Sequence, residues 1–494
     1  MKTLHLSIIL MIGISLVSSI HVVFAYGVST LGGPTRSPNV LLTQILASGN
    51  NVYLLGENEG RFFFQRSTNG GATFESPIQM INSSGSRSVE PRMAVSNNNV
   101  YVAWNYFDQN GTYLDFRKSM NNGASFGNTT TLNRSSSLDF LSLELIASGK
   151  HLYIVWKEDS GFIRLIKSDT NGTRFEPITD LDNNTNRFGD PKIVASNNHV
   201  YLFMEGDCII SSGIQQICYP SPFVRRSDDY GNTWGSINPI INGTAAGFAT
   251  DARAAISEDN VYLIWQFNGY GFGKILFSKS NDDATTFGKT TYLDNNGQEG
   301  YPDVLTNGNN VYLFWQTDSN KTKDIMFAHS KDGGISFSKP INLSDNKFSS
   351  DSYYLYKQVA SAGNNVYVTW EQRNQSNSEI FFKMSSDNGE TFGNTINLSE
   401  DLDRMAKNEA NSTWVNFDRP QMIASGNNVY IGWINNYEGN NNIFFRTSND
   451  GGSTFGNTTL LRENQTIPEF SFAIPILLIS FVSVIVFYRM KFRK

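Results

Sequence analysis

The sequence predicts an all-β protein, a β-propeller of about eight four-stranded blades, with seven blades as the alternative. Two phrases that recur in step along the chain support this prediction. A turn-like phrase such as SNDGGSTF at 448–455 occurs eight times, and its last aromatic residue recurs every 49 to 63 residues. An apolar phrase such as NVYIGWI at 428–434 also occurs eight times, always upstream of the turn phrase. Tandem units of this size indicate a repeat architecture.

Each unit divides into four short strands joined by turns. In the last unit we expect an inner strand in 419–428, a second strand in 429–436, a third in 442–448 and a short outer strand in 456–463. Two units are longer than the others. The fourth carries an insertion between Cys208 and Cys218, and the eighth contains a stretch at 399–413 that predicts a short helix.

The turn phrase has the chemistry of a structural element. An Asp or Asn oxygen accepts from backbone N–H groups in such a turn, and a following Gly adopts a backbone angle that other residues avoid. We expect the closing Phe or Trp to lie between neighbouring sheets. The phrase therefore recurs because every blade needs its outer turn fixed.

These turns resemble the Asp-box, Ser-X-Asp-X-Gly-X-Thr-Trp/Phe, of the sialidase-like propeller superfamily. The copies at 227–234, 385–392 and 448–455 match in full, whereas Thr170 replaces Asp in the third copy and Ala284 replaces Gly in the fifth. The resemblance covers roughly residues 36–465 and implies a peripheral, structural role for the box aspartates, which are Asp229, Asp282, Asp332, Asp387 and Asp450.

Both ends of the chain are hydrophobic. Residues 1–25 read as a signal peptide, with Lys2 before an apolar stretch and a cleavage site after Ala25. Residues 470–488 contain no charge and are followed by RMKFRK, which predicts one transmembrane helix with a cytoplasmic C-terminus. We therefore expect residues 26–467 to form an ectodomain at the outer face of the cell membrane.

The segment 468–494 also resembles an archaeal sorting signal. Pro468-Glu469-Phe470, the hydrophobic stretch and the basic tail are similar to signals that archaeosortase-type enzymes process. The resemblance implies an archaeal source and such an enzyme as a partner. An ordinary single-span anchor is the alternative.

Other features agree with an extracellular ectodomain. The only two cysteines, Cys208 and Cys218, predict a small-loop disulfide. Eight of the Asn-X-Ser/Thr triplets that mark glycan acceptors are at Asn82, Asn110, Asn128, Asn171, Asn242, Asn342, Asn397 and Asn457. The net charge of −6 and the lack of an interior basic block argue against nucleic acid as a partner.

Candidate catalytic residues precede the inner strands, where propeller strands converge on the channel. Sialidases hold a substrate carboxylate with three arginines and use a Tyr nucleophile, a Glu and an acid/base Asp. The resemblance points to Tyr301, Glu299, Asp251, Arg187, Arg253 and Arg419 as channel-mouth candidates. The superfamily's Phe/Tyr-Arg-Ile-Pro motif is absent. Arginines and acidic residues occur close together before several inner strands, as Asp251 and Arg253 do. The other interpretation is that these residues form salt bridges between blades.

No cofactor or metal is expected from the sequence. The chain has five histidines, and Asp180-X-Asp182-X-Asn184 lacks the Gly and distal Glu of a calcium loop. The sequence therefore predicts a surface-anchored propeller that binds a glycan or an envelope protein, or serves as a scaffold at the cell envelope. Exo-glycosidase activity of sialidase type is the alternative, and a purely structural envelope component is a third possibility.

Overall fold

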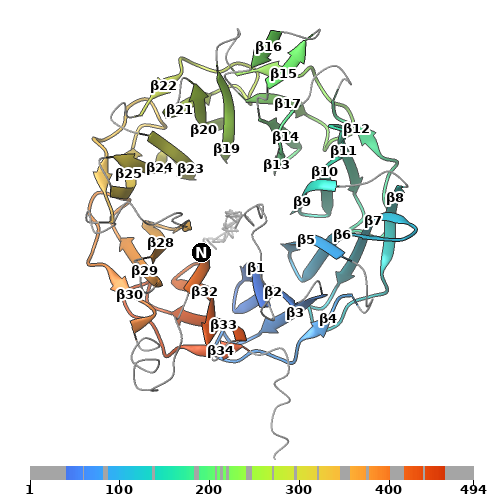
Figure 1. Ribbon diagram of the computed structural model, residues 1–494, viewed down its shortest axis with the longest axis horizontal. Coiled ribbons are helices and arrows are strands. Elements are labelled where there is room, and N and C mark those ends of the chain that lie inside the picture. The colour runs from blue at the N-terminus through green and yellow to red at the C-terminus, as the bar shows by residue number, and fades with distance from the viewer. Residues whose placement is uncertain are drawn as a thin grey trace, which may run out of the picture.

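Eight four-stranded antiparallel sheets stand around a central channel in the computed structural model (Figure 1). The prediction of eight blades is confirmed, and the seven-blade alternative is wrong. The structure describes residues 40–461, except for 59–60, 82–86, 136–139, 159, 183–187, 206–207, 212–214, 219–221, 241–246, 270–271, 294–297, 320–321, 345–355, 374–377, 401–416 and 438–439. The predicted signal peptide, hydrophobic segment 470–488 and sorting motif lie outside these residues, as does nearly all of the predicted helix at 399–413.

The first four blades follow the chain in order. Blade 1 contains β1 (Val40–Ser48), β2 (Asn51–Asn58), β3 (Arg61–Ser67) and β4 (Ile78–Gln79). Blade 2 contains β5 (Arg87–Ser96), β6 (Asn99–Asp108), β7 (Gly111–Ser119) and β8 (Thr130–Ser135). Blade 3 contains β9 (Phe140–Ser148), β10 (His151–Glu158), β11 (Ile163–Ser168) and β12 (Thr179–Asp180). Blade 4 contains β13 (Pro191–Ser196), β14 (His199–Met204), β17 (Phe223–Ser227) and β18 (Asn238–Pro239).

The last four blades repeat the same order. Blade 5 contains β19 (Gly247–Ser257), β20 (Asn260–Gly269), β21 (Phe272–Ser280) and β22 (Thr291–Tyr292). Blade 6 contains β23 (Gln298–Asn307), β24 (Asn310–Ser319), β25 (Thr322–Ser330) and β26 (Ile341–Asn342). Blade 7 contains β27 (Lys357–Ala362), β28 (Asn365–Arg373), β29 (Ser378–Ser385) and β30 (Ile396–Asn397). Blade 8 contains β31 (Phe417–Ser425), β32 (Asn428–Tyr437), β33 (Asn440–Ser448) and β34 (Thr459–Leu461).

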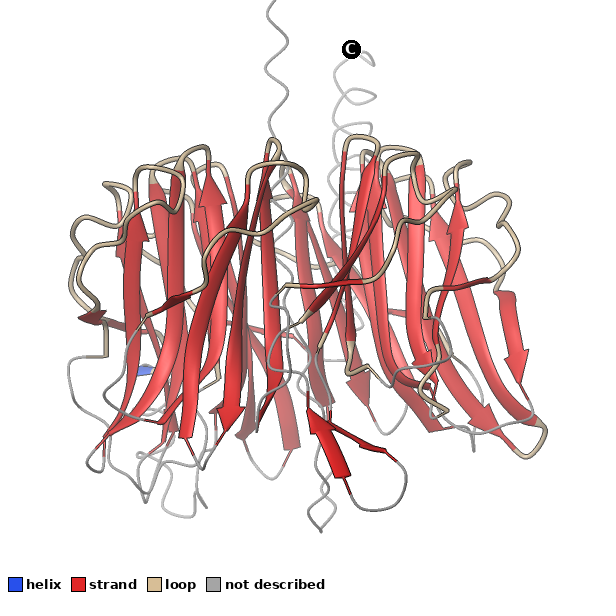
Figure 2. Cartoon of the chain, turned by 90° about the horizontal axis from the view of Figure 1, so that it is seen from above, coloured by secondary structure: helices blue, strands red, loops and turns tan. Residues whose placement is uncertain are grey.

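The strand order gives the ring two distinct faces. The first strand of each blade lies nearest the channel, and the turns after the first and third strands lie together on one face, which we call the turn face (Figure 2). The inner strands begin at the opposite end, which we call the channel mouth. The insertion in blade 4 forms a separate hairpin of β15 (Cys208–Ser211) and β16 (Gln215–Cys218) on the mouth side (Figure 2).

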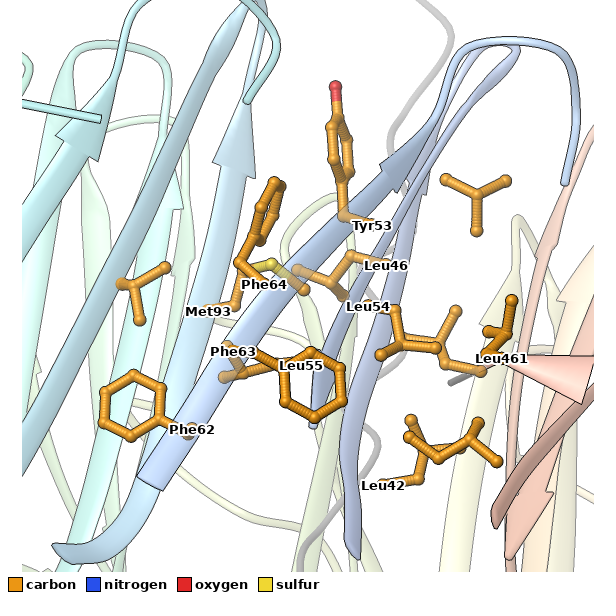
Figure 3. Close-up of a cluster of buried hydrophobic side chains, with 14 of the residues drawn as sticks. Leu42, Leu46, Tyr53, Leu54, Leu55, Phe62, Phe63, Phe64, Met93 and Leu461 are labelled. Atoms are coloured by element: carbon orange, nitrogen blue, oxygen red, sulfur yellow. The ribbon is translucent and has the colours of Figure 1, made fainter. Parts of the chain in front are cut away.

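The hydrophobic core lies in the seams between blades. Each buried cluster joins residues from neighbouring sheets, and the largest packs blade 1 against blades 2 and 8 (Figure 3). There, Met93 of β5 and Leu461 of β34 lie on either side of Leu54 and Leu55 in the view of Figure 3. Blade 1 takes all four strands from the start of the described chain, and blade 8 takes all four from its end. No blade combines strands from both ends, so side-chain packing between blades 1 and 8 closes the ring.

The recurring turn phrase fixes the seams on the turn face. In six seams the closing Phe meets a Phe on the third strand of the preceding blade edge to face, with ring centroids 4.9 to 5.0 Å apart. At the glycine of the same turns, an added Cβ would come within 3.1 Å of that preceding Phe. The glycine is therefore required both for its left-handed backbone and for this close approach.

Within the described part of the chain, no helix is long and apolar enough to cross a membrane.

Candidate ligand site at the channel mouth

A polar residue occupies one equivalent inner-strand position in every blade. This position pairs with the residue two after the repeated Tyr of the second strand. In blade order it holds Gln44, Arg92, Glu144, Lys192, Arg253, Asp303, Gln358 and Gln421. We call this set the polar belt. Five of these eight residues are charged, so the belt forms a polar level of the channel-lining strands.

Ion pairs and hydrogen bonds connect the belt across the seams. Lys192 Nζ lies 2.7 Å from Glu144 Oε1, joining blades 4 and 3. Arg253 Nε lies 3.7 Å from Asp303 Oδ1, joining blades 5 and 6, and Lys357 of blade 7 pairs with the same carboxylate. Among the arginines that the sequence places close to acidic residues, Arg253 therefore forms a salt bridge between blades.

Five of the inner strands carry a β-bulge immediately before the belt position. The register shifts between Leu42 and Gln44, Val89 and Arg92, Thr250 and Arg253, Gly300 and Asp303, and Asp418 and Gln421. In three bulges a non-glycine residue adopts a left-handed backbone, with φ of 52° at Asp251, 52° at Tyr301 and 51° at Arg419. Such a residue costs about 1–2 kcal/mol, and both bulges and backbone strain concentrate at functional sites.

The strained residues lie along an arc of blades 5 to 8. Tyr301 is 46% exposed, although it sits on a channel-lining strand. Lys357 Nζ donates to the Tyr301 carbonyl oxygen at 2.6 Å, which ties the blade 6 bulge to blade 7. At the next seam the Arg419 guanidinium lies over the Tyr356 ring, 5.6 Å from its centroid. We call Asp251, Tyr301, Tyr356 and Arg419 the mouth arc.

Glu205 of blade 4 adds a titratable group beside the mouth arc. It follows β14, and its carboxyl lies against the backbone of Gly189, where an added Cβ would come within 3.0 Å of Glu205 Oε2. Burial raises the pKa of Glu205 to about 7; the charges of Asp251 and Asp190 act in the same direction, and Lys192 and Arg253 oppose them.

The structure brings three of the six predicted site residues to equivalent bulges and a fourth to the belt. These are Asp251, Tyr301 and Arg419 at the bulges, and Arg253 in the belt. Glu299 lies in β23 opposite Thr317, but its side chain lies outside the described residues, as does all of Arg187. Arg253 is shared between two acidic neighbours, Asp251 at 4.0 Å and Asp303 at 3.7 Å.

Several members of the site were missed in the sequence, namely Glu144, Lys192, Glu205, Asp303 and Lys357. For Glu144, Lys192 and Asp303 the signal was present in the repeat itself. Aligning the eight units on the tyrosine of the second strand places a polar residue at the same inner-strand position each time. The link between Lys357 and Asp303 needed the seam geometry, because these residues are 54 positions apart.

The box aspartates lie on the turn face, at the other end of the blades from the bulges. Asp450 Oδ1 accepts from the Thr454 amide at 2.9 Å, and Oδ2 accepts from the Thr454 hydroxyl at 2.5 Å. These bonds, with the Ser448 hydroxyl, lower the pKa of Asp450 to about 2. Asp229, Asp282, Asp332 and Asp387 accept the same pair of bonds in their own turns.

The histidines and the candidate calcium loop hold structural contacts. His151 stacks on Tyr230 of the next blade with centroids 4.3 Å apart, and His199 Nδ1 lies 2.8 Å from Asp228 Oδ1. Asp182 is buried beside the outer strand of blade 3, and Asp180 pairs with Arg164. No group of three or more potential metal ligands occurs among the described residues.

The two cysteines face one another across the blade 4 hairpin. Cys208 and Cys218 are directly paired in the β15–β16 ladder, although their side chains lie outside the described residues. Opposite residues in an antiparallel pair have Cα atoms about 4.5–5.5 Å apart, a spacing that a disulfide spans.

The chain matches no protein-family model and no curated protein. It is similar in fold to several solved structures at low sequence identity. A PL25 ulvan lyase bound to -[GlcA(1-4)Rha3S]- aligns at 11% identity over 64% of this chain and 82% of its own, with a TM-score of 0.42. The polysaccharide lyase Uly1 aligns at 11% identity over 68% and 87%, with a TM-score of 0.46. A K499G mutant of NanB sialidase from Streptococcus pneumoniae aligns at 14% identity over 72% and 67%, with a TM-score of 0.36. These remote likenesses carry no argument about activity.

Proposed function

We propose that this propeller is a binding protein of the cell envelope and that it engages a glycan or a protein partner along the mouth arc. The observation that carries the proposal is the repeated strained bulge. Three blades hold Asp251, Tyr301 and Arg419 in left-handed backbone at one equivalent position. The belt behind the bulges gives this wall a rigid, charged support.

The chemistry of the mouth arc suits a polar ligand with flat apolar faces. An exposed tyrosine offers a ring for stacking and a hydroxyl for hydrogen bonding. The Arg419–Tyr356 pair adds a planar guanidinium on a second ring, within the same series of blades. Surface anchoring is a separate part of the proposal and is supported by the apolar segment 470–488 and its basic flank.

A binding experiment on the full-length chain tests the mouth arc. We expect glycans from cell envelopes, immobilised as an array, to retain the wild-type chain and to lose most retention after Tyr301→Ala or Arg419→Ala. Tyr292→Ala is the matched control, because Tyr292 is 54% exposed but lies on the outer strand of blade 5. Equal loss in the control, or unchanged retention in both arc variants, would contradict this site.

Exo-glycosidase activity of sialidase type is the second candidate. The observation that favours it is an exposed tyrosine on the same arc as Asp251 and Arg419. A tyrosine nucleophile is an established departure from the two-carboxylate mechanism of glycosidases. The ion pairs of Arg253 with Asp251 and Asp303 weigh against it, since a substrate carboxylate would compete with these acids for the guanidinium.

Hydrolysis of aryl sialosides by the full-length chain distinguishes the two functions. Turnover that Tyr301→Phe abolishes would establish the enzyme and place the nucleophile at Tyr301. Binding without turnover would leave the propeller as a binding protein. Turnover that survives Tyr301→Phe would move the nucleophile elsewhere, with Tyr356 as the next residue to change.

A further inference from the structure

The structure separates the glycan-acceptor triplets that the sequence shows as equivalent. Seven triplets fall within the described residues, at Asn110, Asn128, Asn133, Asn171, Asn342, Asn397 and Asn457. We infer that Asn128 and Asn457, on the outer rim of blades 2 and 8, are the glycosylated positions among these seven.

Asn128 and Asn457 occupy the same place in their blades. Each follows the closing Phe of the turn phrase in the sequence Phe-Gly-Asn-Thr-Thr, and each asparagine is exposed. The preceding glycine anchors both stretches in the same way, with Gly127 N donating to Lys118 O and Gly456 N to Thr447 O, each at 2.9 Å. Residues 127–129 and 456–458, which include both asparagines, are in no ladder. The triplet threonines begin the outer strands, where Thr130 is exposed and Thr459 is half-buried, so both asparagines stand on open backbone at the edge of their blades.

Two of the acceptor asparagines, Asn342 and Asn397 of the outer strands, already form hydrogen bonds through their side-chain amides. Asn342 Oδ1 accepts from the Ser344 amide and hydroxyl, both at 2.9 Å, and Asn397 Oδ1 accepts from the Ser399 amide and hydroxyl at 3.0 and 2.9 Å. Ser344 and Ser399 are the hydroxyl residues of the triplets, and both are buried. The nucleophilic Nδ2 of Asn397 donates to Glu379 at 3.1 Å.

The other three triplets are also held by the fold. Asn171 lies inside a seam turn with φ of 52°, and its Oδ1 accepts from the Tyr101 hydroxyl at 3.4 Å. At Asn110 the required hydroxyl belongs to Thr112, which is buried. Asn133 is half-buried within the β8 ladder opposite Leu114.

The modification requires a donor sugar on a polyprenyl phosphate or diphosphate carrier. The asparagine Nδ2 forms a bond to the anomeric carbon, the carbon–oxygen bond to the carrier breaks, and the carrier phosphate leaves with that electron pair. The amide loses one proton to a base of the transferring enzyme. The enzyme must also reach the triplet's hydroxyl residue. Thr130 is exposed and Thr459 is half-buried, whereas Thr112, Ser344 and Ser399 of three other triplets are buried.

Blade 7 supplies an internal control. Asn394 lies at the same rim position, is exposed, and follows Gly393, whose N–H donates to Met384 O at 2.9 Å. It lacks only the hydroxyl residue, because Ile396 stands where Thr130 and Thr459 stand in the other two blades. The substitution Ile396→Thr therefore creates an acceptor at a position that the fold already exposes.

Glycopeptide mass spectrometry of the full chain, purified from its own cells, tests the inference. We expect glycan on Asn128 and Asn457 and none on the other five, loss of one glycan in Thr130→Ala and in Thr459→Ala, and retention in Thr459→Ser. Ile396→Thr is expected to add one glycan at Asn394. Bare Asn128 and Asn457, or glycan on Asn342 or Asn397, would overturn the inference, as would an unmodified Asn394 in Ile396→Thr.

Discussion

The rings of Phe455 and Phe382 meet edge to face, with centroids 4.9 Å apart and planes at 76°, across the seam between blades 8 and 7. Phe455 closes a turn phrase, and Phe382 lies on the third strand of the preceding blade. The same contact recurs in five other seams. A motif that is local in sequence therefore holds two blades together, which explains its recurrence once in every blade.

The serine of the turn phrase is expected to contribute measurably to stability. Ser385 Oγ is buried and accepts from the Gly389 amide at 2.9 Å. Ser385→Ala leaves that buried N–H without its acceptor and is expected to lower the free energy of unfolding by about 1–3 kcal/mol. The neighbouring Ser386→Ala is the control, because Ser386 is exposed. Urea unfolding compares the two, and equal losses would argue against this role.

Two departures from the turn phrase are expected to compensate for each other. In blade 4 the third-strand position that holds Phe in most blades is Val224, and the turn of blade 5 has Ala284 instead of Gly. We expect Val224→Phe to cost about 1–3 kcal/mol through overpacking against the Ala284 methyl group. Adding Ala284→Gly should restore much of this loss. A double-mutant cycle measures the coupling, and additive effects would contradict it.

The backbone strain at Tyr301 is expected to appear as a difference in stability between two variants of that residue. Tyr301 has φ of 52°, which glycine adopts freely and alanine does not. Tyr301→Gly and Tyr301→Ala both remove the ring, so the glycine variant should be the more stable by about 1 kcal/mol. Thermal unfolding measures this difference. An alanine variant as stable as the glycine variant would show that the bulge stores no strain.

Stability should fall as the pH rises through the titration of Glu205. Its carboxyl has a pKa of about 7 in the fold against 4.5 for the ordinary group. Between these values the folded state holds a proton that the unfolded chain has lost, so the free energy of unfolding decreases with rising pH and levels off above about 7. Glu205→Gln should remove this part of the slope. Urea unfolding from about pH 5 to about pH 8 measures it, and an unchanged slope would contradict it.

The hairpin of blade 4 is expected to be closed by a Cys208–Cys218 disulfide. An isolated two-stranded hairpin is marginal in water, and a cross-strand bond restricts its unfolded states. Peptide mapping without reductant should recover the two cysteines in one linked fragment. Cys208→Ser should leave the unfolding midpoint of the propeller nearly unchanged, because β15 and β16 form a sheet of their own. Free thiols in the isolated protein would contradict the prediction.

The blade architecture could be read from the sequence because its signals are local. The repeated tyrosine and tryptophan, the Asn-Gly turns and the closing aromatic each fall at a fixed distance within one unit. Four strands per unit follow from alternating apolar runs and turn residues. The closing of the ring was open in the sequence, since packing of β1 against β31 and β32 joins residues nearly 400 positions apart.

The candidate site was only partly predictable. Tyr301, Asp251 and Arg419 stood out because charged and aromatic residues precede the inner strands. Their shared left-handed backbone lies in bulges, where the register between the inner strand and the second strand shifts, and no residue pattern within one unit marks that shift. The acidic partners of Arg253 and Lys357 come from other strands and other blades, so no spacing within one unit reveals them.

The sequence by itself determined the repeat, the number of strands in each unit and the structural use of the turn phrase, because hydrogen bonds and packing within about 50 residues encode them. Only the tertiary structure decided which charges neutralise one another and which acceptor triplets remain exposed. It also decided which tyrosine reaches solvent at the channel mouth. Those properties depend on distances between blades, which the ring fixes only when all eight are packed side by side.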